Sequence, residues 1–179
     1  MKMVRVVSIL LKWFLEENKH FIITCKKIRR VTFMTEVLKD FRKKFKTDEL
    51  LIYETEYWIW SLRPIQVTLG ASVLSSKREC PVFSELNQEE FSDLNNIIKV
   101  IENTLMKTFN YDVMNYLMLM MVDKQVHYHV IPRYERTISF VGLSWNDSGW
   151  PGVPNLSGNE IDINELHKIR NAIKANLVV

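Results

Sequence analysis

Residues 125–134, Gln-Val-His-Tyr-His-Val-Ile-Pro-Arg-Tyr, constrain the fold more than any other part of the chain. Apolar and polar side chains alternate there, and this period of two predicts a β-strand. Because successive side chains of a strand point to opposite faces, Gln125, His127 and His129 share one face at steps of about 7 Å. The residues between them face the other way and can enter a core. Buried imidazoles need hydrogen-bond partners, so the polar face is a candidate site.

The two histidines allow more than one interpretation. A lone histidine in a strand is usually structural, but two on one face beside an amide favour a reactive site. His-X-His can also bind Zn²⁺, with a third ligand from His20, His167 or a carboxylate. Tight zinc binding that is lost in a His129→Ala variant would support this alternative.

The composition is that of one ordinary globular domain. The chain has 179 residues, of which 47% are hydrophobic and 25% charged. Its 24 basic and 21 acidic residues leave a net charge of +3, which does not indicate a polycation that binds nucleic acid. Basic residues crowd the first fifty positions, which we interpret as solvated helix and loop faces. A surface that attracts polyphosphates is the alternative.

The cysteines and the N-terminus bear on location. Cys25 and Cys80 lie far apart without CxxC spacing, which fits a reduced, cytoplasmic protein. The apolar run in residues 1–15 is interrupted by Lys12 and is too short to span a bilayer. We therefore expect an amphipathic helix there and no membrane partner.

Helical spacing of apolar residues recurs in four places. It predicts helices over residues 4–14, 33–45 and 85–109, and a last helix from Asp162 that buries Leu166, Ile169 and Ile173. In the long helix, Asn87 followed by Glu90 indicates a capping box. Its predicted apolar stripe consists of Phe91, Leu94, Ile98, Ile101 and Leu105.

Aromatic and β-branched runs predict about five strands. They cover residues 50–54, 57–62, 67–75, 115–122 and 125–134, with a bend at Gly70 and a possible further strand at 21–24. The nearly all-apolar run 115–122 predicts a central strand covered on both faces. Its short link to the next strand predicts an antiparallel hairpin, and residues 144–158 read as an ordered loop. The fold class expected is α+β, one antiparallel sheet covered by helices.

The motif Gln-φ-His-φ-His-φ-φ-Pro-Arg resembles the signature of the histidine-triad (HIT) superfamily, His-φ-His-φ-His-φ-φ. The order of strands, Pro-bearing turn, long helix and motif hairpin is also similar. Trp150-Pro151-Gly152 resembles a segment of a bacterial branch described as diadenosine-tetraphosphate-hydrolase-like, which tends to carry Gln at the first triad position. The resemblance covers roughly residues 40–155.

The resemblance implies a role for each site residue. His127 is the expected nucleophile on an α-phosphate, forming a covalent nucleotidyl-histidine that water hydrolyses. Its other ring nitrogen must keep a proton and donate it, commonly to a backbone carbonyl. His129 would lie beside a phosphate oxygen, Asn115 would donate to the phosphate, and Gln125 would support the site. Imidazole suits this chemistry because its pKa is about 6.5.

Two further residues carry alternative roles. Arg133 either binds a distal phosphate or anchors the strand end to a carboxylate. For Trp150, anchoring a loop is favoured over stacking on a base.

The chain departs from the family pattern in several places. Gln125 replaces a histidine and cannot carry charge. Residues 120–124 replace a Gly-Gln-Ser/Thr stretch that supplies phosphate donors, and Lys124 is a conceivable substitute. Ser61 stands where an acidic residue commonly holds the ribose, and Gly70-Ala71 replaces a Gly-His pair.

We therefore expect three regions: an N-terminal helical extension (1–39), a HIT-like catalytic domain (40–155) and a C-terminal helix packed on it (156–179). The expected activity is hydrolysis of dinucleoside polyphosphates or nucleoside phosphoramidates, without a tightly bound cofactor, although a divalent cation can accompany the substrate. On resemblance, the protein is a homodimer. The alternatives are a nucleotidyltransferase with the same intermediate and a non-catalytic nucleotide-binding module.

Overall fold

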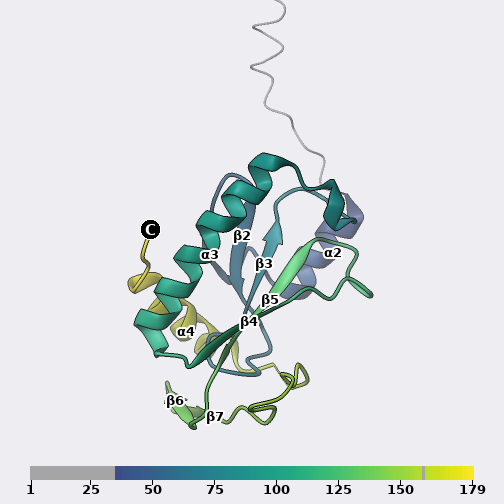
Figure 1. The fold of residues 1–179 in the computed structure, drawn as a ribbon. Helices are drawn as coiled ribbons and strands as arrows, with labels where there is room; N and C mark the ends of the chain where they lie inside the picture. The colour runs from purple at the N-terminus through teal and green to yellow at the C-terminus, as the bar shows by residue number, and fades with distance from the viewer. Residues whose placement is uncertain (1–34, 159) are drawn as a thin grey trace, which may run out of the picture. The chain divides into compact units, whose positions relative to one another are not determined.

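A five-stranded antiparallel sheet organises the residues that the structure, a computed structural model, describes, which are 35–158 and 160–179 (Figure 1). The predicted helix over residues 4–14, the possible strand at 21–24 and most of the 1–39 extension lie outside these ranges. The unit Met34–Val179 is therefore considered by itself.

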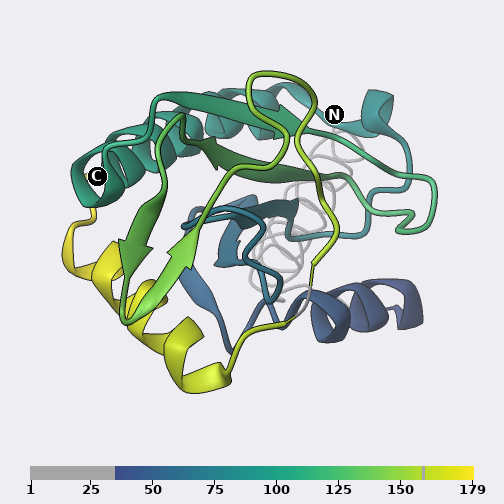
Figure 2. The ribbon, with the colours of Figure 1, turned by 90° about the horizontal axis from the view of Figure 1, so that it is seen from below.

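The strands follow the order β1-β2-β3-β5-β4 across the sheet, and all neighbours are antiparallel. Their bounds are β1 Leu51–Glu54, β2 Trp58–Leu62, β3 Ser72–Ser76, β4 Val113–Leu117 and β5 His127–Arg133. A separate hairpin consists of β6 (Ile138–Phe140) and β7 (Leu143–Trp145). Figure 2 shows this hairpin beside the C-terminal end of the long helix, where Phe140 meets Phe109 edge to face at 5.4 Å.

Within the described ranges, three helices accompany the sheet: α2 (Glu36–Phe45), α3 (Gln88–Phe109) and α4 (Ile163–Ala175), with a short 3₁₀ turn η1 (Phe83–Glu85) before α3. The capping box of Asn87 and Glu90 is formed, and Asp162 caps α4, as predicted. The main core unites α3 and α4 with one sheet face, whereas α2 packs its phenylalanines on Val73 of the other face. The α+β prediction is confirmed.

The predicted stripe of α3 differs in detail from the observed one. Ile97 is fully buried where Ile98 was expected, and Phe91 is 40% exposed. Gly70, the predicted bend, has φ +83° and lies two residues before β3, and a Cβ there would lie 3.0 Å from the Phe109 ring. A glycine at this point therefore lets the chain turn close against α3.

The prediction of a central, doubly covered strand at residues 115–122 is wrong. β4 ends at Leu117 and is the outermost strand of the described sheet, paired with β5 alone. The apolar side chains that follow form an exposed loop, in which Met121 is 89% exposed and Val122 80%. The hairpin with β5 is confirmed, but its connection spans 118–126, longer than predicted. Apolar composition alone did not distinguish a buried strand from the wall of a pocket.

Candidate active site

The two histidines of β5 lie on the sheet face that α2 covers. His129 pairs with Val73 of β3, and Val73 pairs with Ser61 of β2. Directly paired residues of antiparallel strands project to the same side. Ser61, Val73 and His129 therefore form one row across three strands, and His127 lies in the adjacent row opposite Ser75.

Two phenylalanines of α2 pack on the imidazoles. The ring centroids of Phe41 and Phe45 lie 5.1 and 5.7 Å from that of His127, and Phe45 lies 5.8 Å from His129. The helix follows from its sequence: Thr35 caps its first turn, and Leu38, Phe41 and Phe45 recur at helical spacing on its buried side. As a result His127 is fully buried.

The protonation of His127 is set by a local contact. Its Nδ1 lies 2.7 Å from the backbone oxygen of Gln125. A carbonyl oxygen can only accept, so Nδ1 carries the proton and Nε2 presents a lone pair. Burial lowers the pKa of His127, which keeps the ring neutral near pH 7. Nε2 itself is buried and meets no hydrogen-bond partner among the described residues.

His129 is the more accessible imidazole, 7% exposed and edge-on to His127 at 5.1 Å. Burial of the His129 ring is the main cause that lowers its pKa to about 4, and the nearby His127 and Arg63 contribute less. Both rings are therefore neutral at physiological pH.

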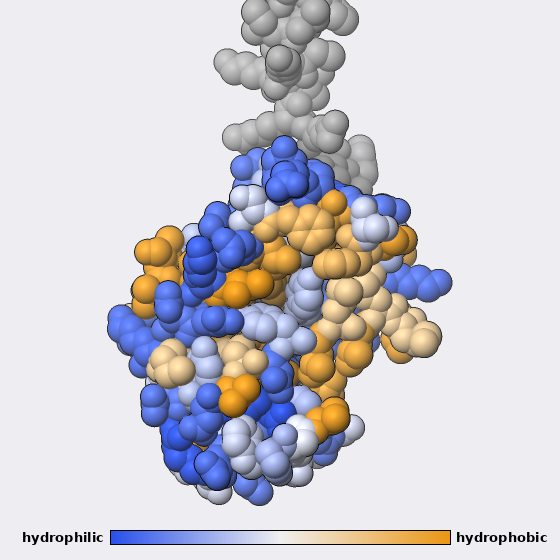
Figure 3. All heavy atoms as spheres, viewed as in Figure 1, coloured by the Kyte–Doolittle hydropathy of each residue, from blue (hydrophilic) through white to orange (hydrophobic). Residues whose placement is uncertain are grey.

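A pocket of about 390 Å³ opens beside His129. Its described lining is Lys44, Phe45, Arg63, Pro64, Ile65, Leu119, Met121, Val122, Asp123, His129 and Glu160. Figure 3 shows apolar side chains gathered over the β4–β5 loop, where Leu119, Met121 and Val122 are exposed. One side of the pocket is therefore apolar, and its polar end is at His129.

The amide of Gln125 does not point into this pocket. Its Oε1 accepts from the backbone N–H of Cys80 at 3.1 Å, and its Nε2 donates to the carbonyls of Ser76 and Arg78 at 3.1 and 2.8 Å. Gln125 is fully buried. Its side chain attaches the motif to the segment after β3, while its backbone oxygen orients His127.

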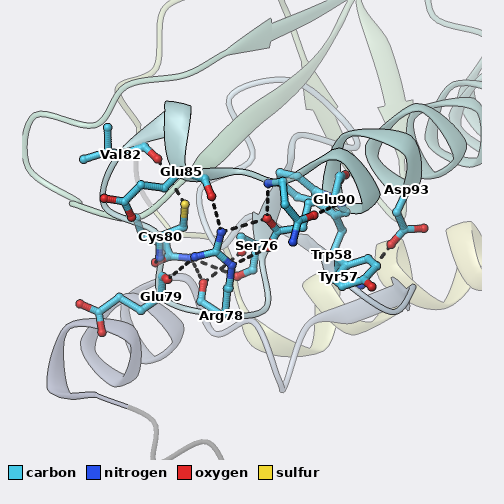
Figure 4. Close-up of polar contacts among 12 residues, drawn as sticks. Tyr57, Trp58, Ser76, Arg78, Glu79, Cys80, Val82, Glu85, Glu90 and Asp93 are labelled. Atoms are coloured by element: carbon cyan, nitrogen blue, oxygen red, sulfur yellow. Dashed lines mark hydrogen bonds and ion pairs between the residues drawn. The ribbon is translucent and has the colours of Figure 1, made fainter.

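The segment that receives Gln125 is itself fixed by an ion pair (Figure 4). The guanidinium of Arg78 binds both carboxylate oxygens of Glu90 on α3, at 2.6 and 2.9 Å, and donates to the carbonyl of Glu85. The Arg78 guanidinium lowers the pKa of Glu90, so the carboxylate stays charged. α3 thereby supports the β5 motif through the 76–80 segment.

Asn115, Arg133 and Trp150 gather at the other end of β5. Arg133 lies four residues beyond His129 on the same face, roughly 13 Å along the strand. Its guanidinium pairs with the buried Asp147 and donates to Asn115 Oδ1 at 2.9 Å, and the Trp150 ring lies 5.9 Å from it. This geometry matches the anchoring alternative for both Arg133 and Trp150.

A shallow hollow of about 720 Å³ adjoins this cluster. Asn115 faces it from β4, where it pairs with Ile131 and so shares the face of the histidines. The structure thus divides the predicted residues into two groups, one around His127, His129 and Ser61 and one around Arg133.

The described residues contain no group of three or more His, Cys, Asp or Glu side chains arranged to hold a metal ion. Of the third ligands considered, His167 lies on α4 beside Glu49 at 3.7 Å, and His20 lies outside the described residues. The zinc alternative therefore has no third ligand within the described part of the chain.

A family model of the HIT domain matches residues 44–136, which include the histidine pair and more than half of the chain. The chain belongs to the histidine-triad family. No curated protein matches it by sequence. None of the helices in the described ranges is both long and apolar enough to cross a membrane.

Solved HIT structures share its fold. A histidine-triad protein from Sinorhizobium meliloti is 19% identical with a TM-score of 0.63, and the match covers 82% of this chain and 98% of that one. A HIT-like protein from Bartonella henselae is 16% identical (TM-score 0.58, covering 78% and 93%). The diadenosine triphosphate hydrolase of Plasmodium falciparum is 15% identical (TM-score 0.55, covering 78% and 95%).

Sequence reasoning missed several residues of this HIT site. Phe41 and Phe45 fall within the predicted helix over residues 33–45, but helical spacing does not reveal that they cover the histidines. Arg63 lies just beyond the predicted strand 57–62, and its spacing of two from Ser61 is the signal that places it on the same face. Asp147, the partner of Arg133, carries no signal in the sequence because it lies fourteen positions later in the chain, beyond a hairpin and a loop.

Proposed function

We propose that this protein is a HIT-type nucleotide hydrolase that cleaves a phosphoanhydride or phosphoramidate bond at the α-phosphate. Dinucleoside polyphosphates and nucleoside phosphoramidates are the proposed substrates. The observation that carries the proposal is the 2.7 Å contact between His127 Nδ1 and the Gln125 carbonyl, because it leaves a neutral ring with Nε2 as the free nucleophile.

In the first step, Nε2 of His127 attacks the α-phosphorus in line, the N–P bond forms and the bond to the leaving group breaks. The ring becomes positively charged, and its Nδ1–H remains bonded to the carbonyl of Gln125, which stabilises that charge. A polyphosphate leaves as an anion, whereas the amine of a phosphoramidate takes a proton from solvent water, because His129 is neutral at physiological pH.

In the second step, water attacks phosphorus and releases a proton to the solvent, while the N–P bond breaks and its electron pair returns to Nε2 of His127. The ring is then neutral again and the nucleoside monophosphate departs. The pocket beside His129 supplies an apolar wall of Phe45, Ile65 and Leu119 for the nucleoside. Substrates of this class are also those of a protein with the same fold, the diadenosine triphosphate hydrolase of Plasmodium falciparum.

Access to His127 requires a movement. Its ring is fully buried beneath Phe41 and Phe45, so these side chains or the exposed loop after β4 must shift to admit a phosphate. Lys44 of α2 joins this loop through Asp123 at 2.7 Å. The ion pair is exposed enough on its lysine side to open at small cost.

The test is a single-turnover incubation with α-labelled diadenosine tetraphosphate. Wild type and a His167→Ala control on α4 should form acid-labile protein label and release AMP. His127→Ala should do neither while keeping its fold, as judged by circular dichroism. Neither label nor product in wild type would contradict the proposal for this substrate, and adenosine phosphoramidate would then be assayed in the same way.

Burial of His127 also motivates a second candidate, a nucleotide-binding module without turnover. Nucleotide affinity that survives His127→Ala, with no product from wild type, would support it. A nucleotidyltransferase would share the labelled intermediate but pass the nucleotide to another acceptor. Product analysis with candidate acceptors separates that activity from hydrolysis.

Three further proposals complete this function. The catalytic domain spans residues 40–155, with residues 1–39 as an extension and 156–179 as a packed helix. No cofactor is held tightly, although a divalent cation can accompany a polyphosphate. The protein forms a homodimer, for which β4, the outermost strand of the described sheet, offers an edge; light scattering of the purified protein tests this.

A further inference from the structure

Arg63 is a buried cation without a matching anion. Arg63 is the first residue after β2 and lies two positions after Ser61. Its side chain therefore projects from the same sheet face as the histidines. The residue is 8% exposed. Its Nη2 donates to the carbonyl of Leu156 at 3.0 Å, which holds the guanidinium in place, whereas Nη1 is buried without a hydrogen-bond partner in the described ranges.

The other charges of the pocket beside His129 are balanced in pairs. Lys44 binds Asp123 at 2.7 Å, and Glu160 binds Lys46 at 2.8 Å. Arg63 lines the same pocket and has no carboxylate partner within the described part of the chain. An unpaired buried guanidinium is costly, because the lost hydration is not replaced. The pocket therefore carries one positive charge for which an anion is missing.

The surroundings indicate which anion fits. Burial lowers the pKa of Arg63, yet arginine stays protonated in proteins. Arg63 and His129 line the same pocket, and the charge of Arg63 is one of the causes that lower the pKa of His129. Arginine presents a planar fork of N–H donors that matches the oxygens of phosphate.

We propose that Arg63 binds a phosphate oxyanion in the pocket beside His129, and that this oxyanion is part of the nucleotide substrate. Naming it as a substrate phosphate rests on the proposed function. The oxyanion site itself rests on the burial, the unpartnered Nη1 and the charge balance of the pocket.

The test measures binding by calorimetry to three probes: inorganic pyrophosphate, AMP and adenosine. Wild type is compared with Arg63→Gln, with Arg63→Lys and with an Arg136→Gln control, whose arginine pairs with Asp112 outside the pocket. Arg63→Gln should lose at least about tenfold in affinity for pyrophosphate and AMP, as expected for a charge-assisted hydrogen bond. Adenosine, which lacks phosphate, should bind all four proteins alike.

The lysine variant keeps the charge but not the fork, so its affinity should be intermediate. It also keeps the test valid if Arg63→Gln fails to fold. Equal pyrophosphate affinity in wild type and a folded Arg63 variant would overturn the inference, as would failure of wild type to bind pyrophosphate. Pyrophosphate binding that depends on Arg63, without covalent label from any nucleotide, would uphold the oxyanion site and reject the proposed hydrolase.

Discussion

His127 Nδ1 lies 2.7 Å from the backbone oxygen of Gln125, two residues earlier on the same face. The tautomer of His127 is therefore set by a main-chain carbonyl, not by the side chain at position 125. That side chain is occupied elsewhere, with the backbone of the 76–80 segment. A glutamine at this position consequently leaves the orientation of His127 intact.

Replacement of Gln125 by alanine should destabilise the protein strongly. Its amide makes three hydrogen bonds to buried or half-buried backbone groups, and all three would be lost. The Arg78 carbonyl would keep the hydroxyl of Ser76 as a donor. We expect a loss of about 3 kcal/mol in the free energy of unfolding, measured by urea denaturation. Gln88→Ala, at the exposed start of α3, is the control and should change stability by no more than ~0.5 kcal/mol. A loss below ~1 kcal/mol for Gln125→Ala would refute the assignment.

Acid should destabilise the protein through its two buried histidines. Burial lowers the pKa of both rings, that of His129 to about 4. In the unfolded chain the pKa is about 6.5, so below that pH the unfolded state binds more protons than the folded one. Stability is then fully present above pH 6.5 and falls as the pH drops toward 4.

For His129 this loss amounts to about 3 kcal/mol, since one pKa unit corresponds to about 1.4 kcal/mol. Urea titrations at pH 4 to 8 measure it. A His129→Gln variant should show a smaller decrease over this range than wild type. The same dependence in both proteins would exclude His129 as its source.

Breaking the Arg133–Asp147 pair should cost far more than breaking a surface pair. Both side chains are at least 96% buried, so removing one partner leaves an uncompensated charge. Asp147→Asn should therefore lower the free energy of unfolding by about 3–5 kcal/mol. Asp112→Asn, which releases the partly exposed Arg136, should cost at most ~1 kcal/mol. Thermal or urea unfolding of both variants gives the comparison, and similar losses would be inconsistent with the structure.

Truncation of Phe45 should open the way to His127. The Phe45 ring packs against both imidazoles, and its removal leaves a cavity beside them. Phe45→Ala should lose about 3 kcal/mol of stability while His127 is modified faster by diethyl pyrocarbonate, followed by mass spectrometry of the His127 peptide. The control is Phe91→Ala on α3, where the phenylalanine is 40% exposed. This variant should leave the modification rate of His127 unchanged. An unaltered rate in Phe45→Ala would show that another element controls access.

Much of the fold was predictable because local patterns decided it. The period of two placed His127 and His129 on one face, and Asn87 with Glu90 marked the start of α3. The role of residues 118–122 was not predictable, because an apolar run is equally compatible with a strand covered on both faces and with a loop that lines a pocket. Topology settled it: β4 is the outermost strand of the described sheet, so its continuation is exposed.

The site was predictable only where its residues are close in sequence. The pairing of Arg133 with Asp147, and of Phe45 with His129, depends on how the hairpin and α2 fold back on β5. No periodicity encodes such contacts. For Gln125 the motif predicted the face of the strand but not the contacts of the side chain. Its three backbone partners come from the 76–80 segment, which is distant in the sequence.

The exposed loop after β4 gives the pocket a chemical vulnerability. Met121 lines the pocket and is 89% exposed, so its thioether is open to oxidants. Conversion to the sulfoxide would turn an apolar, flexible side chain into a polar one. Oxidative damage to the purified protein should therefore change the entrance to the pocket before it reaches the buried histidines. Reduced and peroxide-treated samples would then differ in how tightly the pocket binds an apolar probe, although their folds remain the same.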